Sequence, residues 1–201
     1  GSNTILLSDG EVEETVNNIS FFADANVWEI GLNGTVIRTT NISKRSPTVV
    51  PMTNEPTGIA FNGSNGHYFV TDDDNTEVYD LNPGLDGVLG TIDDTWTSFD
   101  TSTSENLDAE GVTYDSVNDR IFVSDGVNAE IYEYTTAGVL VNHFDVQAFG
   151  VIDPERVEFN PDSNTLFVLS NTGSPIIVET SKSGELLRTL DVSAASAGAP
   201  A

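Results

Sequence analysis

The sequence contains no cysteine and very few cationic side chains. Its 201 residues include seven Lys or Arg and two His, and no Cys. Without cysteine the chain can form neither disulfides nor thiolate-bound zinc sites. His67 and His143 lie far apart in the sequence, and neither has a second histidine at the spacing of a zinc ligand. These absences argue against zinc and against thiol chemistry.

Long apolar runs and the common catalytic motifs are also missing. No apolar stretch approaches the roughly 20 residues that cross a bilayer, so we expect no membrane insertion. The sequence has no G-x-S-x-G elbow, no P-loop and no Rossmann fingerprint. The sequence therefore offers little conventional catalytic machinery.

Acidic residues, by contrast, are abundant. The chain has 32 Asp or Glu against seven Lys or Arg, which gives a formal net charge of −25. A surface this negative repels nucleic acid and anionic lipid, and it attracts cations or cationic partners. Part of the charge fits an ordinary solvated surface, as in a salt-adapted protein. The remainder is clustered, and the clusters are the candidates for function.

The most informative feature of the sequence is an internal repeat of short strand-like runs. Residues 108–149 contain four runs rich in β-branched and aromatic residues, separated by Asn, Asp, Gly or Ser. Gly111-Val-Thr-Tyr in this stretch matches Gly58-Ile-Ala-Phe upstream and Arg156-Val-Glu-Phe downstream. The offsets are 111 − 58 = 53 and 156 − 111 = 45 residues, and they hold for the next two runs as well. A four-stranded unit that recurs every 40–50 residues or so is typical of a β-propeller. A β-sandwich of unrelated strands, the alternative, would not explain constant offsets.

The N-terminal unit is a partial copy with an ambiguity. Phe21-Phe22, Val27-Trp28-Glu29 and Asn33–Ile37 fit the second, third and fourth positions of the repeat. Ile5-Leu-Leu-Ser-Asp-Gly10, however, resembles Ile121–Gly126 and competes with Phe21-Phe22 for the second position. Either Ile5–Leu7 is an inner strand of this unit, or it belongs to a preceding unit.

The repeat predicts an all-β chain, a β-propeller of about four four-stranded blades. We expect a single domain over residues 3–192, with units at about 3–43, 54–104, 105–150 and 151–192, followed by a flexible tail over 193–201. Because the tail is poor in β-formers, closing the ring would need the N-terminal segment, a partner copy or further blades. The chain can therefore be a fragment of a larger propeller or one half of a homodimer.

The second unit carries an insertion with the composition of a calcium site. It reads Asp80-Leu-Asn-Pro-Gly-Leu-Asp-Gly-Val-Leu-Gly-Thr-Ile-Asp-Asp94 where other units have a short turn. Calcium binds about 6–8 oxygen ligands, and glycines let a short loop fold tightly enough for such oxygens to converge. The spacing differs from an EF-hand, and the alternative is a plain acidic surface turn. The candidate metal ligands are Asp80, Asn82, Asp86, Asp93 and Asp94.

The insertion and the units around it resemble known proteins. Residues 83–94 resemble a "PGxDGxxGTxDD" segment of large secreted bacterial proteins, where it lies beside propeller repeats and calcium-binding modules. The units, with Asp108-Ala-Glu-Gly-Val-Thr-Tyr-Asp and Ile121-Phe-Val-Ser-Asp, resemble NHL, gluconolactonase-type and phytase-like propellers. This resemblance implies a calcium-binding module of a larger extracellular or secreted protein, with the periplasm as a second location. It also implies a protein or carbohydrate ligand.

A second acidic set recurs at the start of the units. Glu55, Asp108 and Asp153 occupy equivalent positions, and Glu110 and Glu155 follow the last two by two residues. The first strand of a propeller blade lines the central channel, so these side chains would form a carboxylate ring. Such a ring either binds a cation or raises the pKa of its members. Alternatively, these residues bond backbone amides at strand starts.

Two functions follow from these patterns. The first is a non-enzymatic, calcium-binding propeller that serves recognition, adhesion or scaffolding. The second is a metal-dependent hydrolase, because gluconolactonase-type enzymes hold a divalent metal at the channel and polarise a lactone with it. In that alternative Asp108, Glu110 and Glu155 would carry the site, acting on a lactone or a phosphate ester. The scarcity of Lys and Arg disfavours the phytase-like variant.

Overall fold

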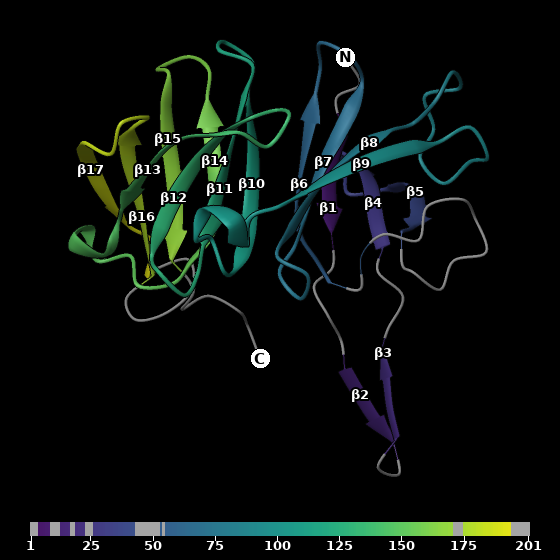
Figure 1. The fold of residues 1–201 in the computed structure, drawn as a ribbon, viewed down its shortest axis with the longest axis horizontal. Helices are drawn as coiled ribbons and strands as arrows, with labels where there is room; N and C mark the ends of the chain where they lie inside the picture. Colours follow the sequence, from purple (N-terminus) through teal and green to yellow (C-terminus); the bar gives the residue numbers. More distant parts are fainter. Residues whose placement is uncertain are drawn as a thin grey trace.

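The structure, a computed structural model, describes residues 4–8, 13–16, 19–22, 26–42, 53, 55–170 and 175–193. The regular elements of these residues are β-strands and two short 3-10 helices, Ser102–Ser104 (η1) and Gln147–Phe149 (η2). Figure 1 shows the strands gathered into successive sheets that follow one another along the chain. The described part of the chain has no helix that is both long and apolar enough to cross a membrane.

Three blades have the predicted four strands. Each is an antiparallel meander in sequence order, with the first strand at one edge and the fourth at the other. Blade 2 contains β6 (Pro56–Asn62), β7 (His67–Asp72), β8 (Glu77–Asn82) and β9 (Thr95–Asp100); blade 3 contains β10 (Ala109–Asp115), β11 (Arg120–Asp125), β12 (Glu130–Thr135) and β13 (Leu140–Asp145); blade 4 contains β14 (Pro154–Asn160), β15 (Thr165–Ser170), β16 (Ile176–Ser181) and β17 (Leu186–Asp191). The prediction of an all-β propeller of about four blades is confirmed.

The turn between the second and third strands repeats in chemical detail. In blade 3, Asp125 accepts hydrogen bonds from the backbone N–H and the side-chain amide of Asn128, at 3.0 and 2.9 Å. In blade 2, Asp72 accepts the same two bonds from Asn75, at 3.0 and 2.8 Å. A short polar side chain that satisfies the backbone of its own turn fixes the turn locally. This explains why an Asp three residues before an Asn recurs at this place in the repeat.

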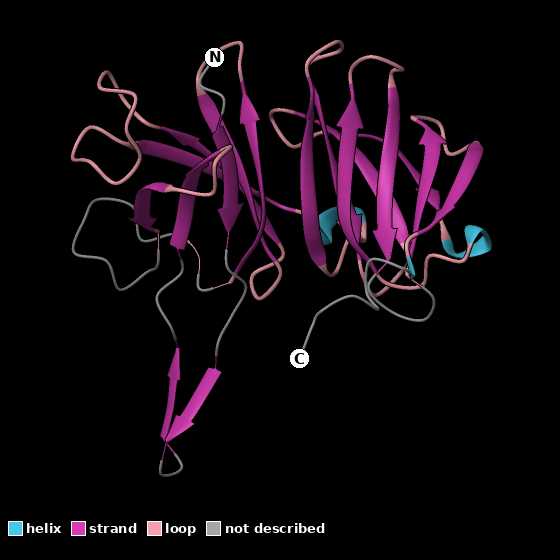
Figure 2. Cartoon of the chain, turned by 180° about the vertical axis from the view of Figure 1, so that it is seen from behind, coloured by secondary structure: helices cyan, strands magenta, loops and turns pink. Residues whose placement is uncertain are grey.

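Blade 1 differs from the other three. It contains β1 (Thr4–Ser8), β4 (Asn26–Gly31) and β5 (Val36–Asn41), in the order β1-β4-β5. Phe21-Phe22 belong to a separate hairpin of β2 (Glu13–Val16) and β3 (Ile19–Phe22), which extends away from the blades in Figure 2. The prediction that Phe21-Phe22 fill the second position was therefore wrong. Ile5 and Leu7 take that position, since they pair with Ile30 and Trp28 of β4.

The hydrophobic core lies between consecutive blades rather than inside one. Each of three buried clusters takes side chains from two neighbours. Phe69 and Val78 of blade 2 meet Ile121 and Tyr132 of blade 3 in one of them. The others join blade 1 to blade 2 and blade 3 to blade 4. Since strand side chains alternate between two faces, blades 2 and 3 bury both faces of their sheets.

The first strands β6, β10 and β14 lie side by side at the centre of the molecule. A Cβ atom added to Gly58 would lie 2.7 Å from the amide nitrogen of Val112, and one added to Gly111 would lie 2.7 Å from the Cα of Arg156. Both distances are shorter than real contacts allow. The glycines are therefore required for one first strand to approach the next.

A buried ion pair joins the last two blades. The carboxylate of Asp115, fully buried at the end of β10, lies 2.7 Å from the ammonium of Lys182 in the β16–β17 turn. The backbone N–H groups of Val117 and Asn118 also donate to Asp115. The carboxylate thus has charge compensation and hydrogen bonds together, which a buried charge needs.

Candidate metal centre

Three carboxylates converge where blade 2 meets blade 3. Asp73 follows β7 directly, Asp108 immediately precedes β10, and Glu110 lies in β10. One oxygen from each of the three lies within 4.8 Å of the other two, and all three side chains are partly buried. Among the residues that the structure describes, this is the group of three acidic or histidine side chains that could hold a metal ion.

Neighbouring residues hold the backbone of this cluster in place. The carbonyl of Glu110 accepts hydrogen bonds from the hydroxyls of Thr57, at 3.0 Å, and of Thr71, both in blade 2. On the blade 3 side, the N–H of Asp108 donates to the side chain of Asn106, at 3.3 Å. The pairing of β10 with β11 shifts register between Ala109 and Val112, as at a β-bulge. Bulges re-aim side chains, and this one lies at Glu110.

The cluster raises the pKa values of its own carboxyl groups. Burial, followed by the negative charges of Glu155, Asp73 and Asp108, raises the pKa of Glu110 to about 8. Burial, followed by nearby acidic groups that begin with Asp73, raises the pKa of Asp108 to about 6. Burial also raises the pKa of Asp73. Desolvation and like charges both disfavour the ionised forms, and at Glu110 they outweigh the opposing positive charge of Arg156.

One carboxylate oxygen of the cluster has no hydrogen-bond partner among the described residues. Oδ1 of Asp73 is buried and accepts no hydrogen bond within the described residues. Buried acceptors are normally satisfied, so this oxygen has capacity for a ligand. Calcium prefers carboxylate and carbonyl oxygens and takes about 6–8 of them. Asp73, Asp108 and Glu110 would supply three, and the chemistry of this donor set suits calcium better than a soft metal.

The acidic ring predicted from the sequence is partly assembled here. Asp108 and Glu110 are in the cluster, and the charges of Asp153 and Glu155 act on the pKa of Asp108. A Cβ atom added to Gly126 would lie 2.6 Å from an oxygen of Asp108 and 2.9 Å from one of Asp153, so these two carboxyl groups border the same glycine. Glu55, the remaining member of the ring, forms a side-chain hydrogen bond that lowers the pKa of Asp73.

Asp73 was not among the site residues predicted from the sequence. The predicted acids lie at the start of the first strands, whereas Asp73 follows a second strand. The feature of the sequence that could have indicated Asp73 is the run Asp72-Asp73-Asp74. In this run Asp72 accepts the hydrogen bonds of the turn from Asn75, and Asp73 takes no part in them. Linking that run to β10 requires the arrangement of two blades, which the repeat alone does not supply.

The insertion of blade 2 uses its acidic side chains differently. Oδ1 of Asp86 accepts the N–H of Val88 at 2.8 Å, and Oδ2 of Asp94 accepts the N–H of Gly90 at 2.6 Å. Oδ2 of Asp93 accepts the N–H of Leu85 at 2.7 Å. These bonds run within the loop and fix its turns. In the described loop, the carboxylates do not form a group of three converging ligands.

The other two predicted ligands also have partners. The carboxylate of Asp80 lies 2.8 Å from Nδ1 of His67 on the neighbouring strand. The side-chain oxygen of Asn82 accepts the N–H of Gly84 at 3.0 Å. The five candidate ligands therefore serve the strand pair and the loop backbone in this structure. Calcium binding by the insertion stays a prediction.

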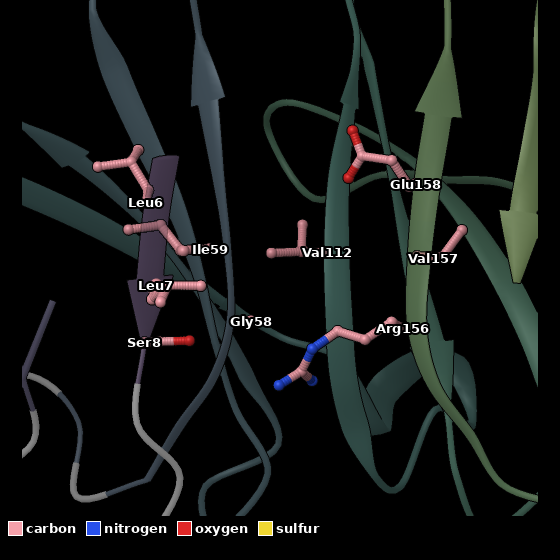
Figure 3. Close-up of a pocket in the computed structure, with 9 residues that line it drawn as sticks. All are labelled: Leu6, Leu7, Ser8, Gly58, Ile59, Val112, Arg156, Val157 and Glu158. Atoms are coloured by element: carbon pink, nitrogen blue, oxygen red, sulfur yellow. The ribbon is translucent and has the colours of Figure 1, made fainter. Parts of the chain in front are cut away.

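A cavity opens beside the three first strands. It has a volume of about 280 Å³ and is bordered by β1, β6, β10 and β14. In Figure 3, Arg156 and Glu158 of β14 point into it, while Leu7 and Ser8 of β1 face it from the other side. A second cavity of about 430 Å³ adjoins it and shares Leu6, Ile59 and Glu158. The positive charge of Arg156 partly offsets the raised pKa of Glu110.

No family model and no curated protein matches the sequence. The chain is nevertheless similar in structure to solved proteins. It superimposes on a chain of the nidogen/laminin complex with a TM-score of 0.61 and 16% identity, over 92% of this chain and 62% of that one. For a luciferin-regenerating enzyme the TM-score is 0.56, with 15% identity over 84% and 54%. For a putative 6-phosphogluconolactonase from Bacteroides uniformis it is 0.54, with 10% identity over 84% and 52%.

These similarities establish the fold. These proteins differ in function from one to the next, and the identities are too low to assign any of those functions to this chain. The chain spans between about half and three fifths of the length of these proteins, at 62%, 54% and 52%. The similar structures thus support a β-propeller architecture and leave its function to be argued from the site.

Proposed function

We propose that this chain is a calcium-binding β-propeller module of a larger secreted bacterial protein, and that it serves recognition or scaffolding. The observation that carries the calcium assignment is the convergence of Asp73, Asp108 and Glu110. Their carboxyl groups face one another at the seam of two blades, with raised pKa values. A bound cation would remove the repulsion that these pKa values report.

The recognition role is supported by the charge of the chain. Its formal net charge is −25, and a surface this negative attracts cationic partners. A cation between two blades would act as a clamp, because it would bond to Asp73 of one blade and to Asp108 and Glu110 of the next. We therefore assign calcium a stabilising role, and the partner of the module would be a protein or a carbohydrate.

The test is calcium titration by calorimetry, together with thermal melts in EDTA, calcium and magnesium. A cation that binds the native state alone stabilises it by about 2.7 kcal/mol at a hundredfold excess over Kd. We expect the wild type to gain stability with calcium and the Asp108→Asn variant to lose that gain. Asp162→Asn, which removes one charge from an exposed turn of blade 4, is the matched control and should behave as the wild type.

The same titration compares the two candidate locations. If the Asp86→Ala/Asp93→Ala variant loses the calcium effect while Asp108→Asn keeps it, calcium binds in the insertion and the cluster assignment is wrong. If the wild-type chain binds no calcium, neither the cluster nor the insertion is a calcium site.

A second function is favoured by the pKa values themselves. Strongly raised pKa values of carboxyl groups in a cleft are frequent at catalytic sites. Glu110, with its pKa raised to about 8, could hold a proton near neutral pH and act as a general acid, while Asp108 would be largely ionised. We propose, as the alternative, a metal-dependent hydrolase of a lactone or a phosphate ester at this cluster.

In this alternative, the residues of the cluster have different roles. Asp73 and Asp108 would hold the cation, which when bound would polarise the substrate oxygen. Glu110, whose pKa is raised by burial and then by the charge of Glu155, would give its proton to the leaving oxygen as that bond breaks. The attacking water would return a proton to the Glu110 carboxylate.

Activity assays distinguish the alternative from a structural role of the cation. A screen of lactones, esters and phosphate monoesters with calcium present should show turnover that is lost in Asp108→Ala and Glu110→Ala. Glu110→Gln should keep the fold and abolish the general-acid limb of the pH profile. An absence of turnover with every substrate class would eliminate the hydrolase and leave the recognition module.

A further inference from the structure

Blade 2 departs from the repeat at two places that border one groove. The insertion over residues 83–94 stands where blades 3 and 4 have a short turn between their third and fourth strands. In Figure 1 this insertion forms the loops beyond the ends of β8 and β9. Tyr68 of β7 takes the position at which Ile121 of blade 3 and Leu166 of blade 4 are fully buried aliphatic residues. Tyr68 and the first residues of the insertion line the same groove.

The groove has an aromatic side that lies entirely in blade 2. Its volume is about 280 Å³, and all of its lining residues belong to positions 61–87. Phe61 of β6 and Tyr68 of β7 are opposite each other in the strand pairing, and their ring centroids are 5.1 Å apart. Phe61 is 49% exposed. Small-molecule sites of about 300 Å³ or more typically have such aromatic walls, so the pair offers a surface on which a ligand can stack.

Polar side chains with unused hydrogen-bonding groups line the groove beside the aromatic pair. Oδ1 of Asn65 and Oδ1 of Asn82 each accept a backbone N–H two residues further on, at 3.0 Å. The amide NH2 groups of these asparagines have no hydrogen-bond partner among the described residues. Asp86 accepts a backbone N–H with Oδ1, and no described residue donates to its Oδ2. The groove therefore has two anchored donors and one anchored acceptor.

This set of groups discriminates between classes of ligand. A Lys or Arg side chain would stack on the aromatic rings and pair with Asp86, but it has no acceptor for the two amide groups. A sugar ring has an apolar C–H face together with hydroxyl groups that both donate and accept, so it can use the rings, the amides and the carboxylate at once. The formal charge of −25 disfavours uronic acids and sulfated sugars. Hydrogen bonding and charge thus both favour an uncharged carbohydrate.

We propose that this groove binds neutral carbohydrate. The proposal rests on the recognition role proposed above and names the class of partner. A sugar ring would stack on Phe61, and its hydroxyl groups would bond to the amides of Asn65 and Asn82 and to the carboxylate of Asp86. Stacking supplies affinity, and the three polar side chains select the orientation of the ring.

Blades 3 and 4 lack this combination of groups. The position of Asn82 holds Thr135 in blade 3 and Thr180 in blade 4. Their third and fourth strands are joined by short turns, which carry no counterpart of Asp86. We therefore expect one binding site in the described residues, and we expect it in blade 2.

The test begins with an array of neutral, amino and uronic oligosaccharides, followed by calorimetric titration of the full chain with the oligosaccharides that bind. We expect neutral oligosaccharides to bind one per chain, with a Kd of about 1 mM or tighter. Uronic oligosaccharides of the same length should bind at least about tenfold more weakly. Phe61→Ala should weaken neutral binding by about tenfold or more, because it removes the stacking ring. If no neutral oligosaccharide binds, the proposal is wrong.

A pair of matched variants tests the hydrogen bonds. Asn65→Asp keeps an oxygen for the turn and replaces the free NH2 group by a second oxygen. Asn118→Asp makes the same change of charge at the equivalent position of the β10–β11 turn in blade 3. Asn65→Asp should weaken binding by about tenfold, and Asn118→Asp should bind as the wild type does. Equal losses in the two variants would reject the groove. Melting temperatures check that each variant is folded.

The calcium assignment can be separated from this proposal. The groove shares no residue with the cluster of Asp73, Asp108 and Glu110, so sugar binding should be the same in EDTA, in calcium and in Asp108→Asn. Calcium stabilisation without binding of any neutral oligosaccharide would overturn the groove alone. Sugar binding without calcium stabilisation would overturn the calcium assignment alone.

A cationic peptide tests the competing class of ligand. An Arg- and Lys-rich peptide is titrated into the wild type and into Phe61→Ala under the same conditions. We expect no binding that depends on Phe61. Peptide binding that is lost in Phe61→Ala, with no binding of neutral oligosaccharide, would assign the groove to a protein partner and reject the carbohydrate.

Discussion

The cluster of Asp73, Asp108 and Glu110 and the insertion of blade 2 are two acidic regions whose carboxyl groups have different neighbours. In the insertion, Asp93 and Asp94 each accept backbone N–H groups. Hydrogen bonds lower the pKa of Asp93, whereas burial raises the pKa of Asp94. In the cluster, Asp108 and Glu110 face other carboxyl groups, and their pKa values rise to about 6 and about 8. The two regions differ in the hydrogen-bond donors that the protein provides to their carboxyl groups.

Asp115 supplies a third case, in which the protein provides its own cation. Its carboxylate is fully buried, yet Lys182 lies 2.7 Å away and two backbone amides donate to it. We expect Lys182→Met to lower the free energy of unfolding by about 3–5 kcal/mol, because it leaves a buried charge without its partner. Urea denaturation measures this loss.

The control for that variant is Arg120→Met. Arg120 is 4.0 Å from Glu133 and its side chain is 34% exposed, so its loss should cost less than about 1 kcal/mol. Equal losses for the two variants would show that Asp115 does not depend on Lys182.

The second prediction concerns pH. Because the pKa values of Glu110 and Asp108 are raised in the folded state, from 4.5 to about 8 and from 3.8 to about 6, the native state binds protons more tightly than the unfolded state. The contribution of these two protonated carboxyl groups to the free energy of unfolding is complete below about pH 4. It is lost as pH rises through 6, the pKa of Asp108, and then 8, the pKa of Glu110. In EDTA, unfolding free energy should fall by about 2 kcal/mol across this window, after allowance for solvent screening.

Two comparisons sharpen the pH prediction. Calcium should flatten the fall, since a cation stabilises the ionised carboxylates, and Glu110→Gln should reduce it. Asp93 in the insertion should act in the opposite direction, because its pKa is lowered. Its contribution to the free energy of unfolding is lost as pH falls through that lowered pKa. Denaturant unfolding at closely spaced pH values measures all three. A fall that is unchanged in Glu110→Gln would contradict the assignment.

The smallest expected effect belongs to the insertion. Asp94 is 6% exposed, and its carboxylate accepts the N–H groups of Gly90 and Thr91. Asp94→Ala should destabilise the chain by about 1–2 kcal/mol, because it leaves these donors without their acceptor. The loss should be the same in EDTA and in calcium if the insertion is a hydrogen-bonded loop. A much larger loss in calcium would assign a cation to it.

The fold was predictable from the sequence because the apolar positions of the repeat are the positions that the fold buries. Positions such as Phe69 and Phe122 lie fully buried between blades, and their constant spacing reports that environment directly. The hairpin of β2 and β3 was not predictable in the same way. Phe21-Phe22 have the composition of a strand, and composition does not distinguish a blade strand from a separate hairpin. Pairing with β4 makes that distinction, and the strand that pairs with β4 contains Ile5–Leu7.

The candidate site was predictable in part. Asp108 and Glu110 were found because they recur at the start of a first strand, as Asp153 and Glu155 do. Asp73 joins them only because the end of β7 lies against the start of β10, which is a relation between blades. The loop acids were assigned to calcium from composition, and composition does not show which backbone amides a carboxylate will accept.

The placement of the core between blades has a consequence for the order in which the molecule unfolds. A chain of units that contact only their neighbours behaves approximately as a one-dimensional array, in which each unit is stabilised by the interfaces it shares. Blade 3 shares two clusters and the Asp115–Lys182 pair, whereas blade 1 shares one cluster. Unfolding should therefore begin at blade 1 and reach blade 3 last, and folding should nucleate at blade 3 and propagate outward.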